Sequence, residues 1–268
     1  MKYYLAVLVF LFLFCSQSFS QINIDSLKTA ANKGFSKAQH TLGLCYYSGA
    51  GVQKDKSQAV QWFRKAAIQG LAQAQHDLGL CYYLGDGVDA DKKKAVELFT
   101  LAAAQDLADA QFNLGLCWFR GEGVEPDKKK AAGWFTKAAE QGFAKAQFNL
   151  GLCYAQGDGV PRNMDKAIEL FAKAADQGLA DAQFNLGVCY FQGNGVAADQ
   201  KKAVELYAKA AAQNQAPAQF SLGVCYFYGL GIESDKRQAV AWIDKARANG
   251  WDKAQEFWTK HELWNYIK

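Results

Sequence analysis

The sequence predicts an all-α fold in which antiparallel helix pairs stack into a solenoid. Its composition allows a packed core, because 50% of the residues are hydrophobic and 21% are charged. Glycine is frequent and proline is scarce, with 24 and 3 copies, which is typical of helices that end in glycine turns. A pattern also recurs every 36 residues without insertion, as expected of a repeat architecture. The cysteines show this period: Cys45, Cys81, Cys117, Cys153, Cys189 and Cys225.

Residues 1–20 have the three parts of a secretory signal peptide. Lys2 precedes an apolar run over 5–14, which is shorter than the roughly 20 apolar residues that a membrane span needs. The small residues Ser18 and Ser20, one residue apart, resemble a signal-peptidase site and predict cleavage after Ser20. The mature chain is then expected to be periplasmic or secreted. An uncleaved anchor and a lipoprotein acylated at Cys15 are the alternative interpretations.

Residues 21–35 resemble the second half of a repeat, and they predict an N-terminal capping helix. Leu27, Ala30 and Ala31 occupy the apolar positions of that half, and Gly34 occupies its closing position. A solenoid needs atypical end units of this kind, because its terminal repeats have a neighbour on one side only.

Residues 36–251 form six repeats, and the first half of each predicts an amphipathic helix. In the first repeat Ala38, Leu42 and Cys45 share one face, and Gly49 ends the helix. Gly43 lies inside this helix, where glycine costs about 1 kcal/mol relative to alanine. Its recurrence predicts the close approach of another helix backbone at six equivalent glycines: Gly43, Gly79, Gly115, Gly151, Gly187 and Gly223.

The second half of each repeat predicts a second helix. Asp55 is the expected N-cap, because its side chain can accept hydrogen bonds from the first backbone N–H groups. Ala59, Phe63 and Ala66 form the apolar stripe, and Gly70 closes the helix. The equivalent caps are Asp91, Asp127, Asn163, Asp199 and Asp235, and Asp106 and Asn214 replace the closing glycine in two repeats.

Residues 252–268 predict a C-terminal capping helix, which brings the expected total to fourteen helices. The segment begins in register at Ala254 and then abandons the repeat pattern for Trp258, Leu263 and Trp264. We expect these large side chains to cover the last repeat on one face and to leave a polar face outside.

The six repeated cysteines are expected to be buried thiols rather than three disulfides. Equivalent points on successive repeats lie about 9–10 Å apart, the spacing of packed helices, whereas a disulfide needs Cα atoms within about 7 Å. Metal binding is not expected, because Cys-x-x-Cys does not occur and histidine is not close in the helix.

The first helices have a second apolar face, which we interpret as a groove for a protein or peptide. Aromatic rings and amides recur there, and amides offer both donors and acceptors to an extended backbone. Two other interpretations stay open: the rings stack on one another between repeats, or the amides bond neighbouring helices. The candidate partner-binding residues are Phe112, Asn113, Phe148, Asn149, Phe184, Asn185 and Phe220.

The repeats resemble the Sel-one-like repeat (SLR) family, a relative of the tetratricopeptide repeat. Residues 110–118 read AQFNLGLCW and residues 146–154 read AQFNLGLCY, each followed by Gly-x-Gly-Val. The resemblance covers about 22–267 and implies a right-handed superhelix that holds a partner in its concave groove. It also implies two alternatives: a penicillin-binding protein or weak β-lactamase, as in a cysteine-rich secreted branch, or a secretory-pathway quality-control component. That branch pairs two cysteines in each repeat, and this chain has one.

Neither an enzyme nor a nucleic-acid-binding protein is expected. The serine β-lactamase motifs Ser-x-x-Lys and Lys-Thr-Gly do not occur, and a net charge of +4 is too small for a nucleic-acid footprint. The three histidines, His40, His76 and His261, are interpreted as ordinary groove or surface residues. Asp77 follows His76 directly, so we expect the two side chains to point to different sides of their helix. We therefore expect no cofactor and no catalytic residue.

Overall fold

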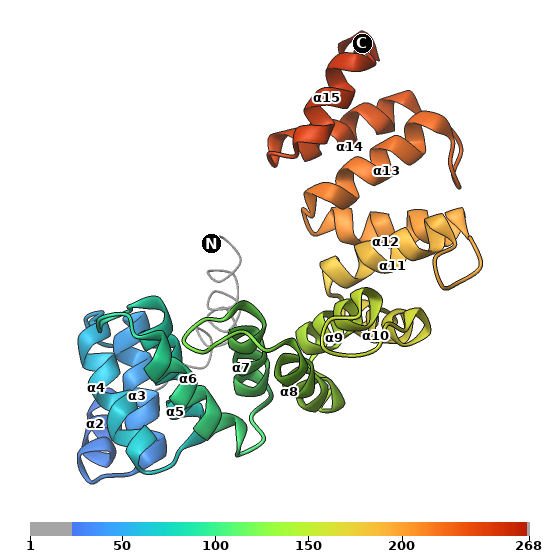
Figure 1. The fold of residues 1–268 in the computed structure, drawn as a ribbon. Coiled ribbons are helices and arrows are strands. Elements are labelled where there is room, and N and C mark those ends of the chain that lie inside the picture. The colour runs from blue at the N-terminus through green and yellow to red at the C-terminus, as the bar shows by residue number, and fades with distance from the viewer. Residues whose placement is uncertain (1–22, 267–268) are drawn as a thin grey trace. The chain divides into compact units, whose positions relative to one another are not determined.

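The computed structural model describes residues 23–266, and their only regular secondary structure is helical (Figure 1). They form fourteen α-helices and a final 3-10 helix, in agreement with the predicted fold class. The chain divides into two compact units, which we call unit 1, ending at Asp127, and unit 2, beginning at Lys128. The predicted signal peptide lies outside the described residues. Within residues 23–266 no helix is long and apolar enough to cross a membrane.

The helices of unit 1 follow the 36-residue period after one leading helix. Helices α3, α5 and α7 are first helices of the repeats, and α4 and α6 are second helices. Helices α3 and α5 each pack against the second helix that follows, and α4 and α6 each pack against the next first helix. The bounds are α2 Ile24–Asn32, α3 Ser36–Ser48, α4 Lys56–Ile68, α5 Ala72–Leu84, α6 Lys92–Ala103 and α7 Ala108–Arg120.

Unit 2 continues with the same alternation. Helices α9, α11 and α13 are first helices, and α8, α10, α12 and α14 are second helices. The bounds are α8 Lys128–Glu140, α9 Ala144–Gln156, α10 Met164–Asp176, α11 Ala180–Gln192, α12 Gln200–Ala212, α13 Ala216–Tyr228, α14 Lys236–Ala248 and α15 Asp252–Lys260, followed by the 3-10 helix η1 at Leu263–Tyr266.

The helix ends have the caps that the sequence predicts. Gly49 ends α3 in the left-handed conformation with φ 85°, and the Asp55 side chain accepts a hydrogen bond from the backbone N–H of Gln58 at the start of α4. Asp106 and Asn214 adopt the left-handed conformation with φ 59° and 62°, so both replace glycine in the closing turn. These caps satisfy backbone groups that helix termini leave without partners.

In the first repeat, core side chains lie between α3 and α4. Leu42 and Ala59 are fully buried, and Phe63 is 1% exposed. A Cβ atom at Gly43 would lie 2.6 Å from the Phe63 ring, so this glycine makes room for an aromatic side chain. The backbone of α4 also comes close, as the sequence predicted, because this Cβ would lie 3.3 Å from the carbonyl oxygen of Ala59. The closest backbone approach occurs at Gly159, where a Cβ would overlap the carbonyl group of Lys128.

The C-terminal end differs from the single helix predicted over 252–268. Helix α15 ends at Lys260, and Glu262 adopts a left-handed conformation with φ 48°. The chain then turns back, so that Leu263 is fully buried in the cluster that contains Ile243 and Trp258. Burial of Leu263 against α14 explains the early helix end, because a continued α15 would carry this residue past the last repeat.

Candidate partner-binding face

A buried glutamine joins the first helix α9 to the second helix on each side of it. In unit 2 the Gln147 side chain donates to the carbonyl of Ala139 in α8 at 3.3 Å and accepts from Gln177, just after α10, at 2.8 Å. Glutamine is buried at this position in all six first helices, and we call these residues the glutamine clamp: Gln39, Gln75, Gln111, Gln147, Gln183 and Gln219. Sequence analysis missed this clamp, although the repeated Ala-Gln dipeptide was a usable signal. The clamp sets the rotation of the first helices and thereby the face that they present.

In unit 2 the candidate phenylalanines lie at equivalent positions of α9, α11 and α13 and are partly buried. The Phe148 ring packs on Phe171 of its own repeat, with centroids 5.7 Å apart, and Phe184 packs on Tyr207 at 5.8 Å. Phe220 meets Phe257 edge-on at 5.7 Å. The first two rings therefore rest on their own second helix rather than on each other.

The amides beside these rings bond to their own helices. Asn149 Nδ2 donates to the carbonyl of Lys145 at 2.8 Å, and Asn185 Nδ2 donates to the carbonyl of Asp181 at 2.8 Å. An amide group has two donor hydrogens and an acceptor oxygen, so each keeps a donor and an acceptor for a partner. Neither amide makes the bond to a neighbouring helix that the sequence left open.

In unit 1 the equivalent face carries polar side chains beside a single phenylalanine. Asn113 Nδ2 lies 2.9 Å from His76 Nε2, so here an amide does bond the neighbouring first helix. His76 Nδ1 lies 3.1 Å from one Asp77 oxygen, and His40 Nε2 lies 2.7 Å from the other. We call these four residues the polar chain. Phe112 is partly buried on the same helix as Asn113.

The prediction that His76 and Asp77 point to different sides of α5 is wrong. Successive residues of an α-helix are separated by about 100° around its axis, not by 180°, so two adjacent side chains can meet at one edge. His40 on α3 bonds the same carboxylate, and this bond helps to place Asp77 at that edge. Burial raises the pKa of Asp77, but the hydrogen bonds from His40 and His76 outweigh it and lower the pKa to about 2. Asp77 is therefore ionised at neutral pH.

The six cysteines are buried thiols, as predicted. Burial raises the pKa of Cys81 and Cys117 to about 12, so the reactive thiolate is rare at neutral pH. Across residues 23–266 no group of three or more His, Cys, Asp or Glu side chains could hold a metal ion.

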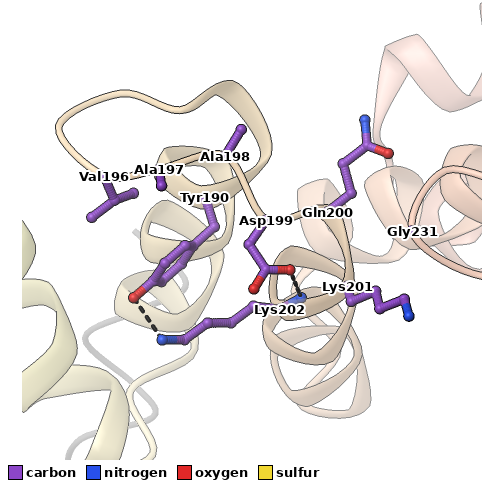
Figure 2. Close-up of a pocket in the computed structure, with 9 residues that line it drawn as sticks. All are labelled: Tyr190, Val196, Ala197, Ala198, Asp199, Gln200, Lys201, Lys202 and Gly231. Atoms are coloured by element: carbon purple, nitrogen blue, oxygen red, sulfur yellow. Dashed lines mark hydrogen bonds between the residues drawn. The ribbon is translucent and has the colours of Figure 1, made fainter.

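An open depression of about 770 Å³ lies in unit 2 beside the start of α12 (Figure 2). Lys202 Nζ donates to the Tyr190 hydroxyl at 2.6 Å, and Asp199 caps the helix by accepting from the Lys202 backbone N–H at 2.9 Å. The Lys202 ammonium and the Asp199 carboxylate are thus already paired within the chain. It is lined by Tyr190, Val196, Ala197, Ala198, Asp199, Gln200, Lys201, Lys202 and Gly231.

The stacked helix pairs and their partly exposed first-helix faces define an α-solenoid repeat protein. The Sel1 repeat model matches six consecutive segments: 36–71, 72–107, 108–143, 144–179, 180–215 and 216–251. They cover more than half of the chain, which therefore belongs to the Sel1 repeat family, as the resemblance predicted. Members of this family are typically protein-interaction scaffolds.

Two solved structures share the fold over most of the chain. The first, c5321, is described as a protective antigen of uropathogenic Escherichia coli with an SLR fold. It is 37% identical with a TM-score of 0.83, and the match covers 88% of this chain and 50% of c5321. The second is a Sel1 repeat protein from Oxalobacter formigenes, 36% identical with a TM-score of 0.79, which covers 87% of this chain and 68% of that one.

One curated relative is the secretory immunoglobulin A-binding protein EsiB of E. coli. It is 44% identical over 45 residues, which represent 17% of this chain and 9% of EsiB. This chain thus spans about half the length of c5321 and a small part of EsiB.

Proposed function

We propose that this chain is an exported, non-enzymatic scaffold that binds an extended segment of another protein on its first-helix faces. The contact residues are Phe148, Asn149, Phe184, Asn185 and Phe220 in unit 2, and Phe112 and Asn113 on the equivalent face of unit 1. The observation that carries the proposal is the pairing of partly exposed rings with amides that keep a donor and an acceptor. Rings bind apolar side chains, and amides bind the backbone of an extended peptide.

Two relatives support the export and binding parts of this proposal. EsiB is named for binding secretory immunoglobulin A, and c5321 is described as a protective antigen. Both descriptions suit a protein that encounters other proteins outside the cytoplasm. The sequence of residues 1–20 supports the same location, since it has the basic start and the short apolar run of a signal peptide.

Selection from a random peptide display library, followed by affinity measurement, tests the binding face. We expect Phe148→Ala with Asn149→Ala to weaken selected peptides about tenfold or more, because one ring contact and one hydrogen-bonding site are lost together. The matched control is Glu169→Ala with Lys173→Ala, which removes an exposed ion pair from α10. Circular dichroism should stay helical in both variants. Equal affinity of the two double mutants would refute the proposed face.

A further inference from the structure

The polar chain of unit 1 contains a carboxylate with unused hydrogen-bonding capacity. Asp77 has one histidine nitrogen on each oxygen, His40 at 2.7 Å and His76 at 3.1 Å. An ionised carboxylate offers about four acceptor sites, so two remain. The Asp77 side chain is 25% exposed, so a ligand can reach it.

The negative charge of Asp77 is not balanced by His76. Nδ1 of His76 donates to Asp77, while its Nε2 accepts from Asn113 Nδ2 at 2.9 Å. An imidazole that donates with one nitrogen and accepts with the other is neutral. The bonds of His76 therefore add no positive charge beside the Asp77 carboxylate.

No lysine or arginine forms an ion pair with Asp77 among the described residues. The neighbouring basic side chains have other partners, since Lys56 pairs with Asp86 at 2.7 Å and Lys92 pairs with Glu122 at 3.0 Å. A partly buried carboxylate without a cationic partner attracts one from a ligand.

The imidazole rings of His40 and His76 flank this carboxylate, and each rests on a buried phenylalanine. The His40 ring packs on Phe63 with centroids 5.6 Å apart, and the His76 ring packs on Phe99 at 5.8 Å. A guanidinium suits such a place better than an ammonium, because it is planar, stacks on rings and can donate two parallel hydrogen bonds to both carboxylate oxygens.

We propose that Asp77, flanked by His40 and His76, is a binding subsite for an arginine side chain of the partner segment. The inference rests on the proposed function, which it deepens by naming one required side chain of the partner. It adds one charged contact in unit 1 to the ring and amide contacts of the proposed function.

Two small probes test the subsite directly in the intact chain. N-acetyl-arginine amide carries the guanidinium, and N-acetyl-citrulline amide is its neutral counterpart of nearly equal shape. Imidazole ¹⁵N signals are followed by NMR at neutral pH, with His261 at the C-terminal end as the internal reference. We expect saturable shifts of His40 and His76 with the arginine probe and about fivefold or weaker affinity for the citrulline probe. Equal responses to the two probes, or shifts that His261 shares, would overturn the proposal.

Two variants complete the test. Asp77→Asn keeps the side-chain shape and should abolish the preference for arginine, and a retained preference would contradict the subsite. If this variant loses its helical circular dichroism, the probe comparison on the unmodified chain decides alone. The double mutant of Phe148 and Asn149 should keep the arginine response, because those residues belong to unit 2. Failure of the subsite is thus separated from failure of the aromatic face.

Discussion

At the scale of single residues, the buried glutamines explain how one first helix is held in place. Gln147 is 6% exposed, and it joins α8, α9 and the end of α10 through one donated and one accepted hydrogen bond. A buried amide is costly unless it is hydrogen-bonded, so both bonds are needed to keep it inside. A buried glutamine recurs at the equivalent position of the other first helices.

We expect Gln147→Ala to lower the free energy of unfolding by about 1–3 kcal/mol. The change leaves the Gln177 amide and the Ala139 carbonyl without their partner and removes buried side-chain volume. Urea denaturation followed by circular dichroism measures the loss. Gln156→Ala on the same helix is the control, since Gln156 is exposed. A loss no larger than that of the control would show that the clamp is not stabilising.

Residue-scale reasoning from the sequence found the caps and missed the hydrogen-bond networks. A cap depends on residues within one turn, so Asp55 and Gly49 could be assigned from local pattern alone. The bond from His40 to Asp77 joins residues 37 apart on different helices. Its existence depends on how two helices are rotated against each other, and no local pattern encodes that rotation.

At the scale of helices and loops, an acidic residue fastens each early loop to the preceding repeat. Glu122 accepts from Lys92 Nζ at 3.0 Å and also from the Tyr83 hydroxyl. Asp86 does the same with Lys56 at 2.7 Å and with Tyr47 at 2.6 Å. In unit 2 Lys128 pairs with Asp158 at 2.6 Å, whereas the later loops carry Asn194 and Leu230 at this position. The acidic residue that forms this ion pair is therefore present in the loops of the second, third and fourth repeats, and the last two loops lack it.

We expect Glu122→Gln to lower the free energy of unfolding by about 0.5–1 kcal/mol in low salt, and by less in 0.5 M salt. The value is small because the Lys92 side chain is 47% exposed and its charge is screened by solvent. Thermal unfolding at the two salt concentrations measures it. The control is Asn194→Asp, where Met164 stands in place of the lysine and no gain is expected. An equal response of both variants would exclude a specific contact.

The same contact predicts a dependence on pH. Burial raises the pKa of Glu122, but the hydrogen bonds from Tyr83 and Lys92 dominate and lower it. A carboxyl whose pKa is lowered by folding stabilises the fold above its ordinary pKa and loses this contribution as the pH falls. The difference between Glu122→Gln and the unmodified chain should therefore vanish in acid.

Helix positions were largely predictable, and the C-terminal end was not. The repeats carry the 3.6-residue periodicity, cap residues and glycine stops in agreement, and agreement of this kind makes a prediction secure. The segment after Lys260 lacks these signals. Its conformation follows from tertiary burial of Leu263 against α14, which outweighs local helix propensity.

At the scale of the whole molecule, the repeat pattern determines the family, whereas side chains on the first-helix faces determine the partner. Membership in the Sel1 repeat family follows from six matched segments, and the fold follows with it. The partner is decided by side chains on the first-helix faces. In the same position these are His40, His76 and Phe112 in unit 1, and Phe148, Phe184 and Phe220 in unit 2. Fold and partner are therefore separate questions in this chain, as in repeat proteins generally.

We expect residues 1–20 to direct export with cleavage after Ser20. A fusion of residues 1–25 to alkaline phosphatase that lacks its own signal should be active in a bacterial host, because that enzyme needs the oxidising periplasm for its disulfides. The N-terminal sequence of the processed fusion should begin at Gln21. A fusion in which Leu8 and Leu11 are both replaced by Arg, which interrupts the apolar run, is the control. Equal phosphatase activity of the two fusions would contradict export by this segment.

The glutamine clamp has a consequence for how such a chain changes over generations. The clamps of Gln75 and Gln147 each join three successive helices within one unit and reach no further, so neighbouring modules there meet through the same contacts. A recombination event that duplicates or deletes 36 codons within a unit would leave the remaining junctions of this kind intact. Descendants can thus acquire longer or shorter recognition surfaces in whole steps, before any point mutation adapts them to a new target.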